Sequence, residues 1–322
     1  MLCRAADTRG DRADTLAPTV PIAVVRLDFD PVLRAAGGAV RLETVVIALG
    51  LLLALLLAAL IAGRSGLDAD RLTAPNFAAW PADLMLVVLT IVPGAVVGGR
   101  VGYALVHLDY YLAHPGAFVD PAQGSLELVL GVVGGTITGA YAASALGRRI
   151  GPWLHVGAVP TLLALAIGKL AMALGGDGQG LPSSLAWATS YVGPGPWGSL
   201  AAAIPSHPSQ LYEALATVLV LAMVVAATMS GAFRRPDGLA LFVGLGGWAI
   251  ARAIVATTWR DATVLGPLGV DQLLCLGLAS ACVGAAMVLG RRAGDSGAWS
   301  IVQRAAPAGR ARRDVEQREV HQ

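Results

Sequence analysis

The sequence predicts an all-α integral membrane protein, a bundle of seven transmembrane helices with its N-terminus outside and its C-terminus in the cytoplasm. Three observations support this fold class. Of the 322 residues, 56% are hydrophobic and only 14% are charged, whereas soluble domains carry roughly 25% charged residues. Apolar runs long enough to cross a bilayer recur along the chain, and arginines alternate between the loops that join them.

The apolar runs are the predicted spans. A helix needs about 20 apolar residues to cross the hydrocarbon core, and the runs lack the alternation of a barrel strand, so each is expected to be helical. The seven predicted spans are 42–63, 83–106, 127–147, 153–175, 210–230, 237–258 and 269–290. Together they form a transmembrane domain, 42–290, between an N-terminal tail and interfacial segment, 1–41, and a basic, disordered cytoplasmic tail, 291–322.

The arginines of the connections set the orientation of these spans. They occur in one alternating set, namely 64–82, 148–152, 231–236 and the tail from Arg291. The connections 107–126 and 176–209 carry none, and 259–268 carries only Arg260. By the positive-inside rule the first set lies in the cytoplasm and the second outside. The arginines of residues 1–41 are balanced by acids, so they do not reverse the assignment.

Three cations lie within predicted spans, where a charge costs at least about 2.5–3.5 kcal/mol at mid-bilayer. Arg100, Lys169 and Arg252 all fall near the outer ends of three different helices, and Lys169 is the only lysine of the chain. Snorkelling to the headgroups is the alternative for each residue alone. Three cations at one depth favour convergence on a shared anion, and Arg260 follows closely enough to join them.

A polar stretch opens the fifth predicted span. Residues 207–213 read His-Pro-Ser-Gln-Leu-Tyr-Glu and lead directly into an apolar run. Helix capping alone is an adequate explanation for Glu213, but it does not explain the accompanying His207, Gln210 and Tyr212. The glycine-rich residues 175–180 end the fourth span, either as a simple C-cap or as backbone amides that face an anion.

These residues resemble those of a known family, the bacterial prolipoprotein diacylglyceryl transferases, from about Asp30 to Leu289. Residues 207–213 read like the family's stretch letter for letter, and residues 98–103 are similar to its Gly-x-Arg-x-Gly-Tyr motif. Its late Arg…Arg…Gln pattern resembles Arg252, Arg260 and Gln272 of this chain.

The chain departs from the family pattern at several positions. The family signature Gly-Arg-x-Gly-Asn-Phe-x-Asn-Gly-Glu reads Gly-Lys-Leu-Ala-Met-Ala-Leu-Gly-Gly-Asp here, at 168–177, so that Lys169 replaces arginine and Asp177 replaces glutamate. Both asparagines are missing. The third-helix histidine of the family is Val133, and its first-helix tyrosine corresponds to Thr44. A lysine supplies the charge of an arginine but not its bidentate fork.

The resemblance implies transfer of a diacylglyceryl group from phosphatidylglycerol to the lipobox cysteine of a prolipoprotein, with release of glycerol phosphate. The expected location is the bacterial inner membrane, with the active site toward the outer leaflet and a monomeric chain. No nucleic acid, metal or cofactor is expected. The expected catalytic residues are His207, Arg252 and Lys169, with His207 as base because Val133 replaces the family's histidine. The expected lipid-binding residues are Arg100, Lys169, Arg252, Arg260, Tyr103, Asp177, Gln210, Tyr212 and Glu213.

Two other functions remain open from the sequence. One is a non-catalytic member of the same fold that binds lipid or lipoprotein, which the missing asparagines and histidine favour. The other is a small transporter. Transporter sites lie near the midplane between repeated, broken helices, whereas the ionisable residues here gather toward the outer edge and no internal repeat is evident.

Overall fold

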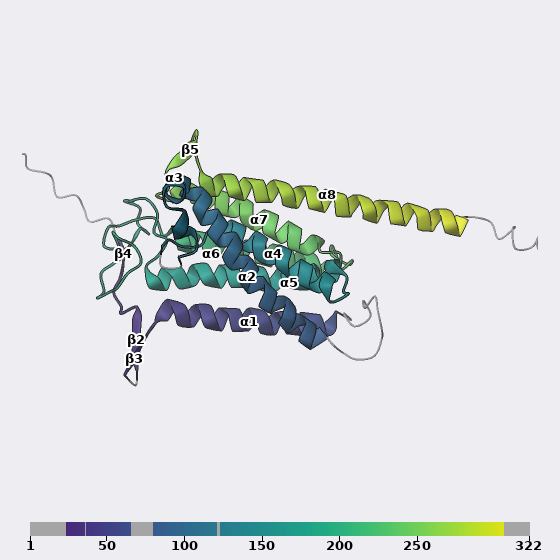
Figure 1. Ribbon diagram of the computed structural model, residues 1–322, viewed down its shortest axis with the longest axis horizontal. Coiled ribbons are helices and arrows are strands. Elements are labelled where there is room, and N and C mark those ends of the chain that lie inside the picture. The colour runs from purple at the N-terminus through teal and green to yellow at the C-terminus, as the bar shows by residue number, and fades with distance from the viewer. Residues whose placement is uncertain (1–23, 36, 66–79, 121–122, 306–322) are drawn as a thin grey trace, which may run out of the picture.

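The computed structural model describes residues 24–35, 37–65, 80–120 and 123–305 (Figure 1). Within this part of the chain, seven helices are long and apolar enough to cross a membrane, which confirms the predicted all-α class and the number of spans. They are α1 (Leu42–Arg64), α2 (Trp80–Val106), α4 (Leu128–Ala145), α5 (Ile150–Gly175), α6 (Ser209–Met229), α7 (Leu239–Val255) and α8 (Val270–Ala305). Each agrees with its expected span to within a few residues, except that α8 continues past the expected boundary at 290.

Short strands and helices gather at one end of the bundle, which we call the strand end (Figure 1). Here α1, α4, α6 and α8 begin and α2, α5 and α7 finish. The short elements are β1 (Val25–Leu27), β2 (Val32–Ala35), β3 (Gly38–Arg41), α3 (Leu108–Ala113), η2 (Pro115–Phe118), β4 (Thr189–Tyr191), η3 (Ala256–Thr258), β5 (Thr263–Leu265) and β6 (Leu268–Gly269). They cover the helix ends that carry most of the residues singled out from the sequence.

Part of the expected N-terminal tail is ordered at this end. β2 and β3 form an antiparallel hairpin that leads into α1. β1 pairs in parallel with β4 from the long connection between α5 and α6. The tail is therefore tied to the loop that precedes α6, whereas residues 1–23 and 306–322 lie outside the described part.

Helices α2 and α4 approach closely along a glycine seam. A Cβ added at Gly98 would lie 2.1 Å from the carbonyl oxygen of Leu130, and one at Gly134 would lie 2.2 Å from that of Gly94. Real side chains do not tolerate such distances, so the backbones are in direct contact. Small residues allow this kind of approach in membranes, where apolar surface alone gives helices no reason to associate. The seam fixes α2 against α4.

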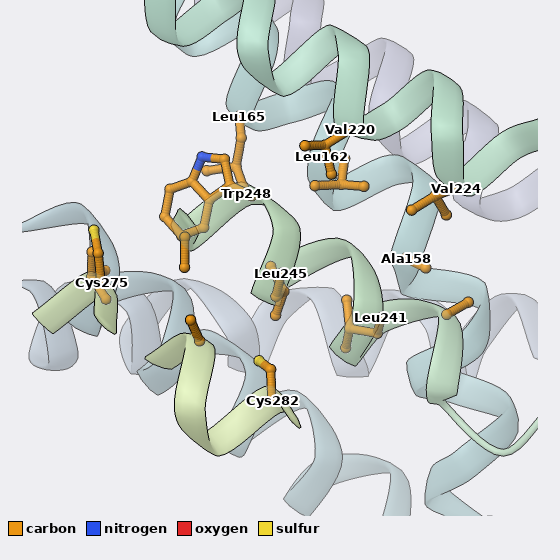
Figure 2. Packing of buried hydrophobic residues seen from close by; sticks show 14 residues of the cluster. Ala158, Leu162, Leu165, Val220, Val224, Leu241, Leu245, Trp248, Cys275 and Cys282 are labelled. Atoms are coloured by element: carbon orange, nitrogen blue, oxygen red, sulfur yellow. The ribbon is translucent and has the colours of Figure 1, made fainter. Parts of the chain in front are cut away.

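The main core lies between α5, α6, α7 and α8. Trp248 of α7 is fully buried at its centre, and Figure 2 shows Leu165 of α5 beside its ring. Cys275 and Cys282 of α8 belong to the same cluster and are free thiols. Both are small buried side chains of the core, a common role for free cysteines. This core holds α7 between α5 and α8 and so sets the positions of Lys169 and Arg252 at the strand end.

Candidate functional site

Glu213 lies between two buried cations near the strand end. Its Oε2 is 3.1 Å from Nζ of Lys169 and its Oε1 is 2.6 Å from Nη1 of Arg252. The three side chains come from α5, α6 and α7, and the Glu213 side chain is only 2% exposed. The sequence placed the two cations at one depth, and the structure brings them together. It also gives Glu213 a role other than helix capping, because one carboxylate joins three helices.

Aromatic rings cover the Arg252 guanidinium. The Trp259 ring centroid lies 4.4 Å from Cζ of Arg252 and 5.9 Å from Nζ of Lys169. Tryptophan faces attract cations, most strongly when water is excluded. Asp271 of α8 adds a second carboxylate, 3.6 Å from Nη2 of Arg252. The cations are therefore held in place before any ligand arrives.

Lys169 and Arg252 line a polar cavity of about 700 Å³ at the strand end. It contains Tyr103 and Asp177 among the predicted site residues. Five carboxyl side chains also line it: Glu43, Glu127, Asp177, Asp261 and Asp271. Because these acids outnumber the cations, their protonation decides whether an anion can enter.

Burial moves some of these carboxyls toward the neutral form. Burial raises the pKa of Asp177, and Arg41, 3.6 Å away, only partly opposes the rise. Burial also raises the pKa of Glu127. Glu127 caps α4, since its carboxylate oxygens accept hydrogen bonds from the backbone N–H groups of Val129 and Leu130 at 2.5 and 2.7 Å. The cavity is thus less negative than a count of its acids implies.

A smaller cavity of about 230 Å³ also borders Lys169, Arg252 and Glu213, and it includes Gln210 and Arg260. Oε1 of Gln210 and Nε of Arg252 are buried without a hydrogen-bond partner in the described part of the chain. Buried polar atoms are nearly always satisfied by protein, water or ligand. The two atoms therefore indicate space for a hydroxyl-bearing or charged group beside the cations.

An apolar cavity of about 510 Å³ runs between α2, α4 and α5. Its lining includes Ile91, Val132 and Leu154, and it shares Leu128 and Leu165 with the polar cavity. The two cavities are therefore adjacent. The first has most of the charged side chains, and the second is lined mainly by aliphatic ones apart from Glu127, which both share. A molecule with an ionic head and hydrocarbon chains matches this arrangement.

Arg100 does not join the cation pair. Its Nε donates to the carbonyl oxygen of Phe118 at 2.8 Å, and its Nη2 donates to those of Ala117, Asp120 and Gln123 at 2.5–2.7 Å. All are carbonyls of the segment after α3. Of the three predicted cations, Arg100 therefore holds a loop, and it is absent from the lining of the polar cavity.

The polar stretch at the start of α6 also braces loops. Ser209 Oγ lies 2.6 Å from Thr258 Oγ1, and Gln210 Nε2 donates to Tyr191 Oη at 3.0 Å. Tyr212 Oη accepts from Trp187 Nε1 and lies 3.5 Å from Nδ1 of His207.

Arg260 acts on the same connection. It donates to the Gly180 carbonyl oxygen at 2.6 Å and to Ser206 Oγ at 2.9 Å. These contacts fix the long 176–208 connection against the ends of α6 and α7. His207 is absent from the lining of the polar cavity.

Sequence reasoning missed several residues of this cavity. Glu43 lines it, one residue before the Thr44 matched to the family's tyrosine. His107 and Asp261 also line it from connections after α2 and α7. The signal available in the sequence was their place in connections expected on the same side as residues 207–213, but a charge in a loop does not show which way it faces.

Comparisons with known proteins agree with the resemblance. A family model described as prolipoprotein diacylglyceryl transferase matches residues 31–289. Three relatives, each named phosphatidylglycerol–prolipoprotein diacylglyceryl transferase, are similar to this chain. The Geobacter sulfurreducens protein is 29% identical over 60% of this chain and 72% of its own length. The Gluconacetobacter diazotrophicus protein is 34% identical over 59% and 69%, and the Nitrobacter winogradskyi protein is 32% identical over 69% and 73%.

Proposed function

Because the chain belongs to the prolipoprotein diacylglyceryl transferase family, we propose that it transfers a diacylglyceryl group from phosphatidylglycerol to the lipobox cysteine thiol of prolipoproteins and releases glycerol phosphate. The observation that carries this proposal is the joining of two kinds of cavity. Buried Lys169 and Arg252 border a polar chamber that adjoins an aliphatic one. A phospholipid is a ligand of this shape and polarity.

The phosphate is proposed to bind at the two cations. Attack on the glyceryl carbon leaves negative charge on the departing phosphate, and fixed cations in a dry site stabilise such charge strongly. Glu213 engages one side of each cation, while Nε of Arg252 is left without a partner in the described structure. The phosphate therefore binds beside cations that Glu213 already holds in place, and it contacts them without displacing the Glu213 carboxylate.

The other predicted residues have supporting roles in this proposal. Gln210 lines the small cavity, and its Oε1, which has no partner among the described residues, suits a glycerol hydroxyl of the headgroup. Arg260 borders the same cavity and braces its wall. Arg100 shapes the site through the loop it holds. The acyl chains occupy the cavity between α2, α4 and α5, and the strand end faces the outer leaflet.

A direct test uses bacteria depleted of their own transferase and supplied with this chain. Mass spectrometry of a reporter lipoprotein is expected to show a diacylglyceryl increment on its lipobox cysteine. Lys169→Met is expected to abolish the increment, because the methionine fills the space without charge. Lys169→Arg restores a cation with a bidentate fork and is expected to retain it. An unmodified cysteine with the intact chain present at normal levels would refute the proposal.

The alternative is a lipid-binding member of the family without transfer activity. The neutral Val133 and the carboxylate already paired with both cations favour it. The same experiment separates the two functions when phosphatidylglycerol binding is measured alongside. Binding that depends on Lys169, with no increment on the cysteine, identifies the alternative.

A further inference from the structure

His107 lies in the wall of the polar cavity, in the turn between α2 and α3. The chain has five histidines, of which His321 lies outside the described part. Of the other four, His107 alone belongs to the lining that also contains Lys169 and Arg252. Its side chain is exposed, so a soluble molecule can reach it. The cavity therefore contains one imidazole together with the two cations.

Two contacts of His107 fix the ring and its tautomer. Nδ1 lies 3.1 Å from the carbonyl oxygen of Tyr103, and the ring stacks on the Tyr103 ring at a centroid distance of 4.2 Å. A carbonyl oxygen only accepts, so Nδ1 carries the hydrogen. In the neutral ring the lone pair therefore resides on Nε2. This is the arrangement in which a histidine acts as a base, with one nitrogen anchored and the other free to accept a proton.

Asp261 supplies a carboxylate on the same side of the cavity. Its pKa is raised, first by partial burial and then by Asp271, and His107 and Arg252 act against that rise. His107 is thus close enough for its charge to act on Asp261.

His207 has a different setting. Its backbone joins the loop to α6 through hydrogen bonds with Gly180 and Leu181. Its Nδ1 lies 3.5 Å from the Tyr212 hydroxyl. These contacts suit a residue that shapes the start of a helix. The geometry favours His107 over His207 as a proton acceptor at the cations.

We propose that His107 is the general base of this chain and takes the place of the family's third-helix histidine, an inference that rests on the proposed function. Nε2 of His107 accepts the lipobox thiol proton, and the sulfur forms a bond to the glyceryl carbon that carries the phosphate. The bond between that carbon and the phosphate oxygen breaks, and its electron pair stays on the departing glycerol phosphate beside Lys169 and Arg252. The imidazolium then gives its proton to that phosphate.

An imidazole suits this step better than the carboxyls of the cavity. A free thiol has a pKa of about 8.5 and a carboxyl of about 4, whereas an imidazole lies between them. A base whose pKa is near the working pH transfers protons most effectively. The thiolate, not the thiol, is the nucleophile.

The test measures transfer to a lipobox peptide by the full chain in vesicles of phosphatidylglycerol. His107→Ala is expected to lower the rate about 10²–10⁴-fold, the usual contribution of general base catalysis. Added imidazole is expected to restore part of the rate. His114→Ala is the matched control, because His114 repeats the same contacts, with Nδ1 3.1 Å from the Tyr110 carbonyl oxygen and its ring stacked on Tyr110, but is absent from the cavity lining. The His114→Ala variant is expected to transfer at the wild-type rate and not to respond to added imidazole.

The outcomes distinguish the two proposals. An inactive wild type refutes the proposed function and this inference with it. An active wild type with an equally active His107→Ala variant refutes only the role of His107. So does a folded His107→Ala variant that is slow and does not respond to imidazole. If that variant fails to fold, His107→Gln is judged instead, because its amide keeps a donor for the Tyr103 carbonyl oxygen but accepts no proton; normal transfer by it overturns the inference and loss supports it.

Discussion

Removing the charge of Glu213 is expected to destabilise the bundle strongly. At an effective dielectric constant of about 20, unit charges separated by 2.6 and 3.1 Å attract by about 5–6 kcal/mol each. The cost of desolvating three buried charges offsets much of this attraction, and removal of one partner from a buried pair typically costs about 3–5 kcal/mol. Glu213→Gln leaves Lys169 and Arg252 close together without their common counter-charge. We expect a loss of about 3–5 kcal/mol in the free energy of unfolding.

The measurement is thermal unfolding of the detergent-solubilised chain, followed by circular dichroism. Glu43→Gln is the control, because Glu43 pairs at 3.2 Å with Arg41 and the two side chains are 17% and 40% exposed, so solvent screens this pair more than the buried one and a smaller loss is expected. The double variant Lys169→Met/Glu213→Gln should recover part of the loss, since one uncompensated cation is gone. Equal melting of Glu213→Gln and wild type would refute the reasoning.

Three further predictions concern the supports of the site. Gly98→Ala should lower the melting temperature because its Cβ would meet the Leu130 carbonyl oxygen at 2.1 Å, whereas Gly277→Ala, with nothing within 4 Å, should not; equal effects would contradict the close seam. Arg100→Lys should expose the segment after α3 to proteolysis while α2 remains protected, because lysine has fewer donors and no planar fork; an unchanged cleavage pattern would count against the loop-holding role. Tyr191→Phe should cost about 1–3 kcal/mol of unfolding free energy, since Tyr191 Oη donates to a buried carbonyl oxygen at 2.7 Å, and unfolding in denaturant would show no loss if that bond were unimportant.

The spans and the depth of the cation pair were predictable because both follow from position along the sequence. Hydrophobicity along the chain gives each crossing, and distance from a span end gives the depth of a charge. Lys169 and Arg252 share a depth and both contact Glu213. Arg100 shares the depth but points to a loop. Its direction around the bundle depends on how α2 packs against α4, which a single sequence does not reveal.

The remaining parts of the site come from connections. His107 and Asp261 follow the ends of α2 and α7, and no hydrophobic period orients such residues. One local signal for His107 is visible in retrospect, because Tyr and His recur four residues apart at Tyr103 and His107 and again at Tyr110 and His114. The repeat predicts stacking. It does not tell which of the two histidines borders a cavity.

The contacts of Arg100 have a mechanical consequence for how the site opens. A side chain of α2 holds the segment after α3 through four backbone carbonyl oxygens, so the segment and the helix are expected to move together. Ser125, whose carbonyl oxygen Arg100 also contacts at 3.4 Å, lines the polar cavity together with Tyr103 of α2. Arg100 therefore holds this wall of the polar cavity in place. Any widening of the cavity is therefore expected at lining residues outside the segment that Arg100 holds, such as Gly178 on the connection after α5.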